Sequence, residues 1–405
     1  MSNPVATTPV LARNAARPQT ASIGILATIS AAHMINDMMQ SLILALYPIL
    51  KGELQLSYGQ IGLITLSYQL TASLFQPLVG LYTDRRPVPW SLPFGMGFTL
   101  CGLLLLSRAP TYGWVLLAAA LVGIGSSIFH PESSRVARMA SGGQHGLAQS
   151  VFQVGGNTGS ALGPLVVAKV IAPHGPHSVA WFALAALLGI GLLSQVSRWY
   201  ALRCLTDTAK GSTRAAGHGL PRRSVVVAIG VLLLLIFSKY FYIASISSFY
   251  TFYLIGKFGL SVQAAQMQLF VFLAASAAGT LIGGPVGDRI GRKPVIWGSI
   301  LGVAPFALAL PYVGLELTIA FTVLIGLILS SAFSAILVYA QELIPGKVGA
   351  VSGLFFGFAF GMGGLGAAAL GLLADATSID VVYRACAFLP LLGVVAIALP
   401  ATKRA

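Results

Sequence analysis

Residues 284–293 read GPVGDRIGRK and residues 80–85 read GLYTDR, so a Gly, an Asp and an Arg recur 204 positions apart. A second match at the same offset joins residues 126–129, which read SSIF, to residues 330–333, which read SSAF. A fixed internal offset is the signature of a duplicated architecture. We therefore predict two related halves, each containing one copy of the short charged stretch.

The composition of the 405 residues excludes a water-soluble globule. Only 8% of them are charged and 56% are hydrophobic, whereas about a quarter of a soluble chain is charged. Apolar runs of roughly 20 residues recur along the sequence, and each is long enough to cross a hydrocarbon core of about 30 Å. We therefore expect an all-α protein with many spans embedded in a lipid bilayer.

Turns and charges divide the apolar sequence into twelve predicted transmembrane helices. They cover about residues 22–50, 57–82, 91–107, 113–138, 145–172, 178–200, 223–255, 261–287, 293–312, 315–341, 346–374 and 379–400. An even number of spans places both termini on one side. Placing the termini in the cytoplasm puts 18 of the 24 Lys and Arg residues on that side, as the positive-inside rule requires. The net charge of +14 therefore indicates orientation and not a nucleic-acid partner.

The order of polar and apolar stretches predicts five regions. They are a disordered cytoplasmic tail (1–21), a six-helix half (22–200), a basic cytoplasmic linker (201–222), a second six-helix half (223–400) and a cytoplasmic tail (401–405). Duplicated halves of this kind are the organisation of secondary transporters, whose solute site lies near the membrane midplane. The three scattered cysteines indicate neither disulfides nor a metal spacing. No GxxxxGK[ST] sequence is present, which argues against ATP as the energy source.

The charged stretch 284–293 resembles the loop signature of the major facilitator superfamily, G-x-x-x-D-R-x-G-R-R/K, and lies between predicted helices eight and nine. The copy at 80–85 departs from this pattern, because Arg86 and Pro87 follow it without the second Gly. A carboxylate beside guanidinium groups at a helix end can latch neighbouring helices in one of two arrangements; ordinary positive-inside loop charge is the alternative. The predicted gating residues are Asp84, Arg85, Glu132, Arg135, Asp288, Arg289, Arg292, Lys293 and Glu342.

Longer stretches resemble an efflux branch of the same superfamily, namely residues 33–42, 125–138, 238–242 and 358–365. This resemblance implies export of an anionic phosphonate antibiotic across the bacterial inner membrane. It also implies that protons are exchanged for the solute.

Asp37 and His33 are the predicted proton-coupling pair. Asp37 lies about 15 residues into the first predicted helix, or roughly 22 Å at 1.5 Å per residue, so it is deep in the membrane. His33 is four residues earlier on the same helical face and can pair with it. A charge at this depth costs at least about 2.5–3.5 kcal/mol. We therefore expect Asp37 to have a functional role. A permanently neutralised packing pair is the structural alternative.

Lys239 lies at a similar depth in the seventh predicted helix. A partly dry ammonium suits a phosphonate or carboxylate; the alternative is that Lys239 serves as the internal counter-ion of Asp37. We also expect His130, which precedes the helix-kinking Pro131, to face the cavity. The predicted solute-binding residues are Lys239, Tyr240, Tyr242, His130, Gln153 and Asn157.

Gly159, Gly163 and Pro164 in the fifth predicted helix resemble part of an antiporter motif of the superfamily. We expect them to serve helix packing, because small residues let membrane helices approach closely. His33, Asp37 and His130 could be assembled into a metal site, yet membrane histidines more often carry protons. We therefore expect neither a metal nor a cofactor.

These patterns predict a monomeric transporter with twelve transmembrane helices, not an enzyme, whose partners are protons and a small anionic solute. Three alternatives remain open from the residues alone. They are an importer or uniporter of a small metabolite, a membrane receptor that does not transport, and a membrane-embedded enzyme.

Overall fold

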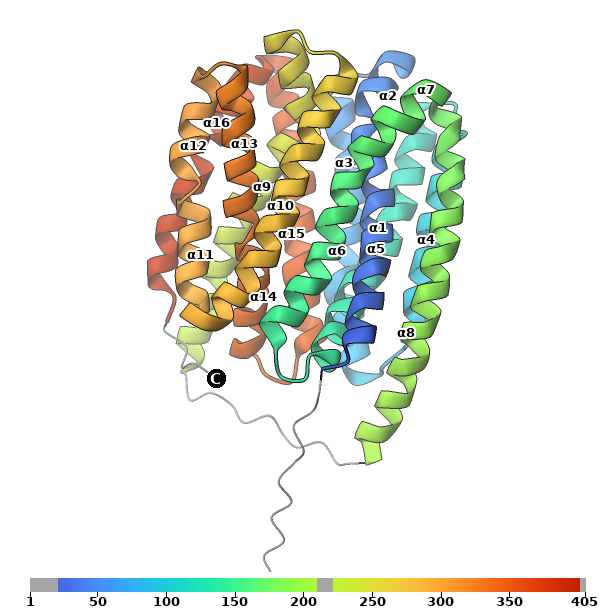
Figure 1. Ribbon diagram of the computed structural model, residues 1–405, viewed down its shortest axis with the longest axis vertical. Coiled ribbons are helices and arrows are strands. Elements are labelled where there is room, and N and C mark those ends of the chain that lie inside the picture. The colour runs from blue at the N-terminus through green and yellow to red at the C-terminus, as the bar shows by residue number, and fades with distance from the viewer. Residues whose placement is uncertain (1–20, 210–220, 401–405) are drawn as a thin grey trace, which may run out of the picture.

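The computed structural model describes residues 21–209 and 221–400, and these residues form helices without a strand. In Figure 1 the helices run along the long axis, with α1 to α8 on the right and α9 onward on the left. The order is α1 (Ile23–Ala45), α2 (Tyr47–Leu54), α3 (Tyr58–Arg85), α4 (Ser91–Leu106), α5 (Tyr112–Ala140), α6 (His145–Val166), η1 (Val167–Ile171), α7 (Ala172–His174), η2 (Pro176–Phe182), α8 (Ala183–Ala209), α9 (Arg222–Phe258), α10 (Val262–Ile290), α11 (Arg292–Leu301), α12 (Ala304–Ala309), η3 (Leu310–Tyr312), α13 (Leu315–Ser330), α14 (Ala332–Leu343), α15 (Val348–Ala376), α16 (Ile379–Cys386) and η4 (Leu389–Ala398). We call α1 to α8 the N-terminal set and α9 to η4 the C-terminal set.

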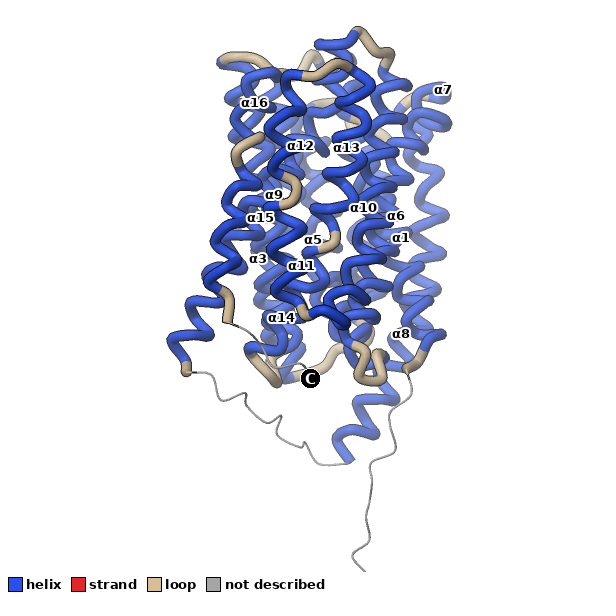
Figure 2. The backbone as a smooth tube through the Cα atoms, turned by 60° about the vertical axis from the view of Figure 1, so that its left-hand side comes forward, coloured by secondary structure: helices blue, strands red, loops and turns tan. Residues whose placement is uncertain are grey.

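The all-helical prediction is confirmed for the described residues. A bilayer offers no water to backbone N–H and C=O groups, and a helix satisfies these groups internally. Among the described residues, eight helical segments are long and apolar enough to cross a membrane. Figure 2 shows the helices still lying side by side after a turn of 60°. The count of twelve spans stays a prediction.

Two predicted helices contain a local irregularity of one residue in the structure. The helix expected over 315–341 is divided at Ser331 into α13 and α14, whereas its repeat counterpart α5 continues through Pro131. The first predicted helix also divides, at Leu46, into α1 and α2. A break frees backbone groups that need other partners, and Thr280 Oγ1 donates to the carbonyl of Ser330 across 3.2 Å. The backbone carbonyl at this point therefore has a hydrogen-bond donor on the neighbouring helix α10.

The predicted tails 1–21 and 401–405 fall almost entirely outside the described residues, as do residues 210–220 of the predicted linker 201–222. What the structure describes here is that α8 extends to Ala209 and that α9 begins at Arg222. The five predicted regions therefore remain predictions.

Glycines bring several helices into backbone contact. A Cβ atom at Gly159 would overlap the backbone of Met34 and Met38 in α1, and one at Gly163 would overlap Ser41. The same α6 helix ends at Val166 in a π-helical turn, two residues after Pro164. These positions therefore set how closely α6 approaches α1.

We predict that Gly159→Ala lowers the thermal stability of the purified protein. Overpacking of this kind costs about 1–3 kcal/mol, because the backbone of α1 cannot move aside cheaply. Gly97→Ala is the matched control, since nothing lies within 4 Å of its Cβ position and Ala favours a helix over Gly by about 1 kcal/mol. Thermal unfolding in detergent measures both variants. Equal midpoints would show that the α1–α6 contact is not tight.

Candidate solute and proton site

A cavity of about 210 Å³ lies between the N-terminal and C-terminal sets. Its volume is below the range of about 300–1,000 Å³ that is typical of drug-sized ligands, so it suits a small solute. The walls come from α1, α3, α5 and α6 on one side and from α9, α10, α13, α14 and α15 on the other. The lining includes these residues predicted from the sequence: His33, Asp37, His130, Gln153, Asn157, Lys239 and Tyr240.

His33, Asp37 and His130 form one cluster on the N-terminal wall of the cavity. His33 Nε2 lies 3.2 Å from Asp37 Oδ2, and His130 Nε2 lies 3.6 Å from Asp37 Oδ1. The two Nε2 atoms are 3.3 Å apart. Asn36 Nδ2 donates to Asp37 Oδ1 across 3.0 Å. The cluster thus joins α1 to α5 through three titratable side chains.

The backbone partners of the two rings indicate where protons lie in this cluster. His33 Nδ1 lies 2.8 Å from the carbonyl of Phe152, and His130 Nδ1 lies 3.1 Å from the carbonyl of Ser126. A carbonyl can only accept, so His33 Nδ1 carries a proton, whereas His130 Nδ1 also lies 3.1 Å from Ser126 Oγ, a hydroxyl that can donate or accept. In a neutral ring His33 Nε2 is then an acceptor that faces the Asp37 carboxylate across 3.2 Å. A proton shared between His33 and Asp37 would turn this contact into a hydrogen bond.

The same three side chains are the described residues that could hold a metal ion. Their donor atoms lie within 4.8 Å of one another, and imidazole and carboxylate both suit transition metals. A proton shared between His33 and Asp37 would account for their 3.2 Å contact without an ion. The expectation of no metal site is not tested and stays a prediction.

Lys239 stands on the opposite wall of the cavity. Its side chain is 3% exposed, and its ammonium lies 5.5 Å from the ring centroid of Phe333 and 5.7 Å from that of Tyr240. No carboxylate of the described residues pairs with it. Because a buried unpaired charge is expensive, an anion in the cavity would be a favourable partner.

Other predicted solute-binding residues differ in their surroundings. The amide oxygen of Gln153 has no hydrogen-bond partner and lines the cavity. Asn157 Nδ2 donates to Thr280 Oγ1 across 2.5 Å, so it joins α6 to α10. Tyr242 is buried but does not line the cavity, and its hydroxyl therefore has no access to a solute in this conformation.

One end of the bundle, at the bottom of Figure 1 where α14 lies, carries the predicted gating residues. We call it the basic end. Arg135 Nη2 lies 2.6 Å from Asp84 Oδ1, and its Nε lies 3.6 Å from Glu132 Oε1. Asp84 also accepts from the backbone N–H groups of Gly349 and Ala350, at 3.1 and 2.8 Å. Asp84 therefore caps the N-terminus of α15 and ties the two sets together.

The second charged stretch forms a related cluster within the C-terminal set. Arg292 bonds to Asp288 across 2.9 Å and to Glu342 across 2.5 Å. A Cβ at Gly146, near the N-terminus of α6, would overlap the carboxylate of Asp288, so this stretch also abuts the other set.

The remaining predicted gating residues lie apart from these clusters. Lys293 donates instead to the carbonyls of Ile397 and Leu399. Arg85 and Arg289 are exposed and take no part in the ion pairs of the described residues. The structure therefore brings together six of the nine predicted gating residues, in two separate groups.

Asp375, at the opposite end, is a residue that the sequence analysis missed. It accepts from the backbone N–H groups of Tyr58 and Gly59 at 3.1 and 2.7 Å, and so caps the N-terminus of α3. Gln266 Nε2 adds a 3.0 Å bond to the carbonyl of Ala45. A sequence signal existed, since an Asp at the C-terminal end of its own helix is unfavourable there and indicates a partner elsewhere.

A bundle of membrane-crossing helices with a polar cavity enclosed between two sets is the architecture of a membrane transporter. The chain belongs to the Major Facilitator Superfamily, whose family model matches residues 29–253 and 232–405. This family consists of transporters, so the protein is a membrane transporter of a small solute and not an enzyme.

Two curated relatives cover nearly the whole chain. The fosmidomycin resistance protein of Escherichia coli (strain K12) is 67% identical over 94% of this chain and 93% of its own. The MFS-type transporter YfnC of Bacillus subtilis (strain 168) is 43% identical over 98% of this chain and 97% of its own. Among solved structures, the human organic anion transporter MFSD10 matches with a TM-score of 0.71 at 16% identity, covering 93% of this chain and 99% of that one.

We predict that Asp375→Asn opens the end of the cavity opposite the basic end. Loss of the cap removes a contact that joins the two sets, so the population shifts toward a state open on this side. A cysteine placed at Ala45, which is 1% exposed and lines the cavity, reports the change after Cys101, Cys204 and Cys386 are replaced by Ser. A membrane-impermeant maleimide should then react several-fold faster.

Asp84→Asn is the matched variant at the basic end. It should slow the reaction of the same cysteine, because it releases the other end instead. Equal rates in both variants would contradict a latch at each end.

Proposed function

We propose that the protein exports an anionic organic solute, with the phosphonate antibiotic fosmidomycin as the test solute, in exchange for protons. It would do so as a monomer in the bacterial inner membrane, through twelve spans in two halves with both termini in the cytoplasm. The 67% identity to a fosmidomycin resistance protein and the excess of Lys and Arg in one set of predicted loops support this proposal.

The main support for an anionic solute is the unpaired Lys239 ammonium on the cavity wall. In a water-poor cavity an ammonium attracts an anion far more strongly than it would in bulk water. Tyr240 and Gln153 line the same cavity and can supply further polar contacts. A phosphonate or carboxylate group would therefore replace the counter-ion that Lys239 lacks.

The proton role of Asp37 and His33 is supported by the 3.2 Å contact between His33 Nε2 and Asp37 Oδ2, which is a hydrogen bond only when a proton lies between them. His130 completes this cluster through its 3.3 Å contact with His33. With one shared proton the cluster is neutral, and without it the cluster carries one negative charge. A proton that enters from one side of the membrane and leaves on the other would change the charge of the cavity by one unit per cycle.

Export by exchange is favourable in a cell with an inside-negative potential. Each negative charge that leaves gains about 2.3 kcal/mol per 100 mV, and each proton that enters gains as much. The caps on α15 by Asp84 and on α3 by Asp375 would be the gates that open in turn.

A second candidate function, proton-coupled import, is favoured by the charges in the same cavity. A deprotonated cluster repels an anion bound at Lys239, and a neutral cluster does not, so charge alone favours binding of the proton and the anion together. Binding together is what a symporter requires. Exchange requires instead that a conformational change separates the two binding events. The direction of the pH gradient that drives solute uptake into proteoliposomes distinguishes the two functions.

We predict that Asp37→Asn abolishes pH-driven accumulation of fosmidomycin in proteoliposomes but retains its counterflow. The amide preserves the shape of the side chain but cannot carry the coupling proton. Asp380→Asn, an exposed change outside the cavity, is the control and should accumulate the solute normally. Gradient-driven accumulation by Asp37→Asn would refute the proton role.

We predict that Lys239→Ala weakens binding of fosmidomycin to the purified protein roughly 10- to 150-fold. This range corresponds to the loss of a hydrogen bond to a charged group, about 1.5–3 kcal/mol. Lys257→Ala is the matched control on the same helix, because Lys257 bonds to Tyr253 and to the carbonyl of Pro311 outside the cavity. An unchanged affinity in Lys239→Ala would show that Lys239 does not bind the anion.

A further inference from the structure

A continuous series of rings connects the two polar centres of the cavity. Lys239 lies over Phe333, whose ring centroid is 5.1 Å from that of Phe356. Phe356 in turn is 5.2 Å from His130, and Phe360 is 4.9 Å from the same histidine. The rings therefore extend from the ammonium on one wall to the proton cluster on the other.

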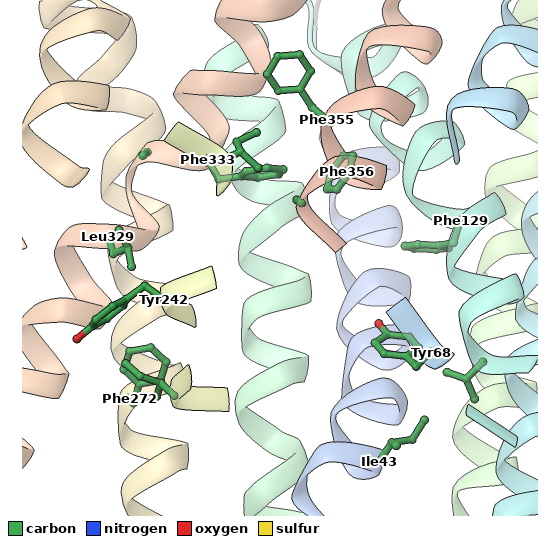
Figure 3. Packing of buried hydrophobic residues seen from close by; sticks show 14 of the residues in the cluster. Ile43, Tyr68, Phe129, Tyr242, Phe272, Leu329, Phe333, Phe355 and Phe356 are labelled. Carbon is green, nitrogen blue, oxygen red and sulfur yellow. The ribbon is translucent and has the colours of Figure 1, made fainter. Parts of the chain in front are cut away.

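These rings belong to the cavity and not only to the packed core. Phe333, Phe356 and Phe360 all line it, although Phe333 and Phe356 are only 3% and 2% exposed. Figure 3 shows Phe333 and Phe356 at the same level on neighbouring segments of the C-terminal set. Phe333 lies two residues beyond the break at Ser331, so the start of α14 carries this ring to the cavity.

The rings have two physical consequences for a bound solute. They offer an apolar surface directly beside the ammonium, where the carbon part of an organic anion can escape from water. They also offer no acceptor to that ammonium, so the charged group of the solute must provide one. An inorganic anion would gain only the second interaction.

We infer that Phe333, Phe356 and Phe360 form an aromatic subsite that binds the carbon body of an organic anion whose acidic group contacts Lys239. This inference rests on the proposed anion transport and specifies its solute class. Small inorganic anions such as nitrate and phosphate, which have no carbon body, bind weakly. Selectivity therefore follows the apolar length of the solute as well as its charge.

A series of alkylphosphonates with one to four carbons, titrated calorimetrically into the purified full-length protein, tests the subsite. Each buried methylene contributes about 0.8 kcal/mol, so affinity should rise about fourfold per added carbon. Nitrate and phosphate should bind more weakly than every member of the series. An affinity that does not change with chain length would overturn the inference.

Variants identify the rings responsible. Phe360→Ala, at a partly exposed position that tolerates truncation, should reduce the increment to below about twofold per carbon. Phe358→Ala on the same helix is the matched control, because Phe358 does not line the cavity, and it should keep the full increment. An equal reduction in both variants would overturn the assignment.

Counterflow of fosmidomycin in proteoliposomes distinguishes this inference from the proposed function. Counterflow together with a flat alkylphosphonate series refutes the subsite and leaves anion transport standing. A steep series without counterflow refutes transport of fosmidomycin and leaves the subsite standing.

Discussion

A charge buried in a bilayer needs a partner, and this constraint organises the polar interior of the protein. Arg135 meets it through Asp84 and Glu132, and Asp37 meets it through two histidines. Lys239 alone among these buried charges has rings as neighbours and no carboxylate. The internal pairs fix the scaffold, and the unpaired ammonium leaves one favourable interaction for a ligand to complete.

The caps on α3 and α15 are reciprocal. Asp84 lies near the C-terminus of α3 and caps α15, while Asp375 lies near the C-terminus of α15 and caps α3. A carboxylate is unfavourable at the C-terminus of its own helix and favourable at the N-terminus of a neighbouring helix. Each cap therefore compensates the misplaced carboxylate and also provides acceptors for the free N–H groups of the neighbouring helix. In the proposed transport cycle, opening either end of the cavity would break one cap, and the surviving cap would act as the pivot.

The sequence predicted the helical membrane fold because apolar length and charge depletion depend on the bilayer and not on contacts between distant residues. It also predicted which charges lie deep, since depth follows from counting along a helix. The sequence did not predict how each helix is rotated about its own axis, and therefore which side chains face the cavity. Tyr240 lines the cavity and Tyr242 does not, because two residues turn a helix by roughly 200° at 3.6 residues per turn. The same reason separates exposed Arg85 from capping Asp84.

Contacts between residues far apart in the chain could not be read from one sequence. Asp375 and Tyr58 are 317 positions apart, and the rings near Lys239 come from helices whose order in space depends on the whole fold. The rings also bear on how the cavity works. A direct pair between Lys239 and Asp37 would leave the cavity without a free cation, and the solute would have to break that pair before it could bind. In the described conformation Asp37 is paired on one wall and Lys239 is unpaired on the other, with rings in contact with Lys239 and His130. In the proposed cycle, proton and anion would therefore bind at separate places while each still responds to the charge of the other.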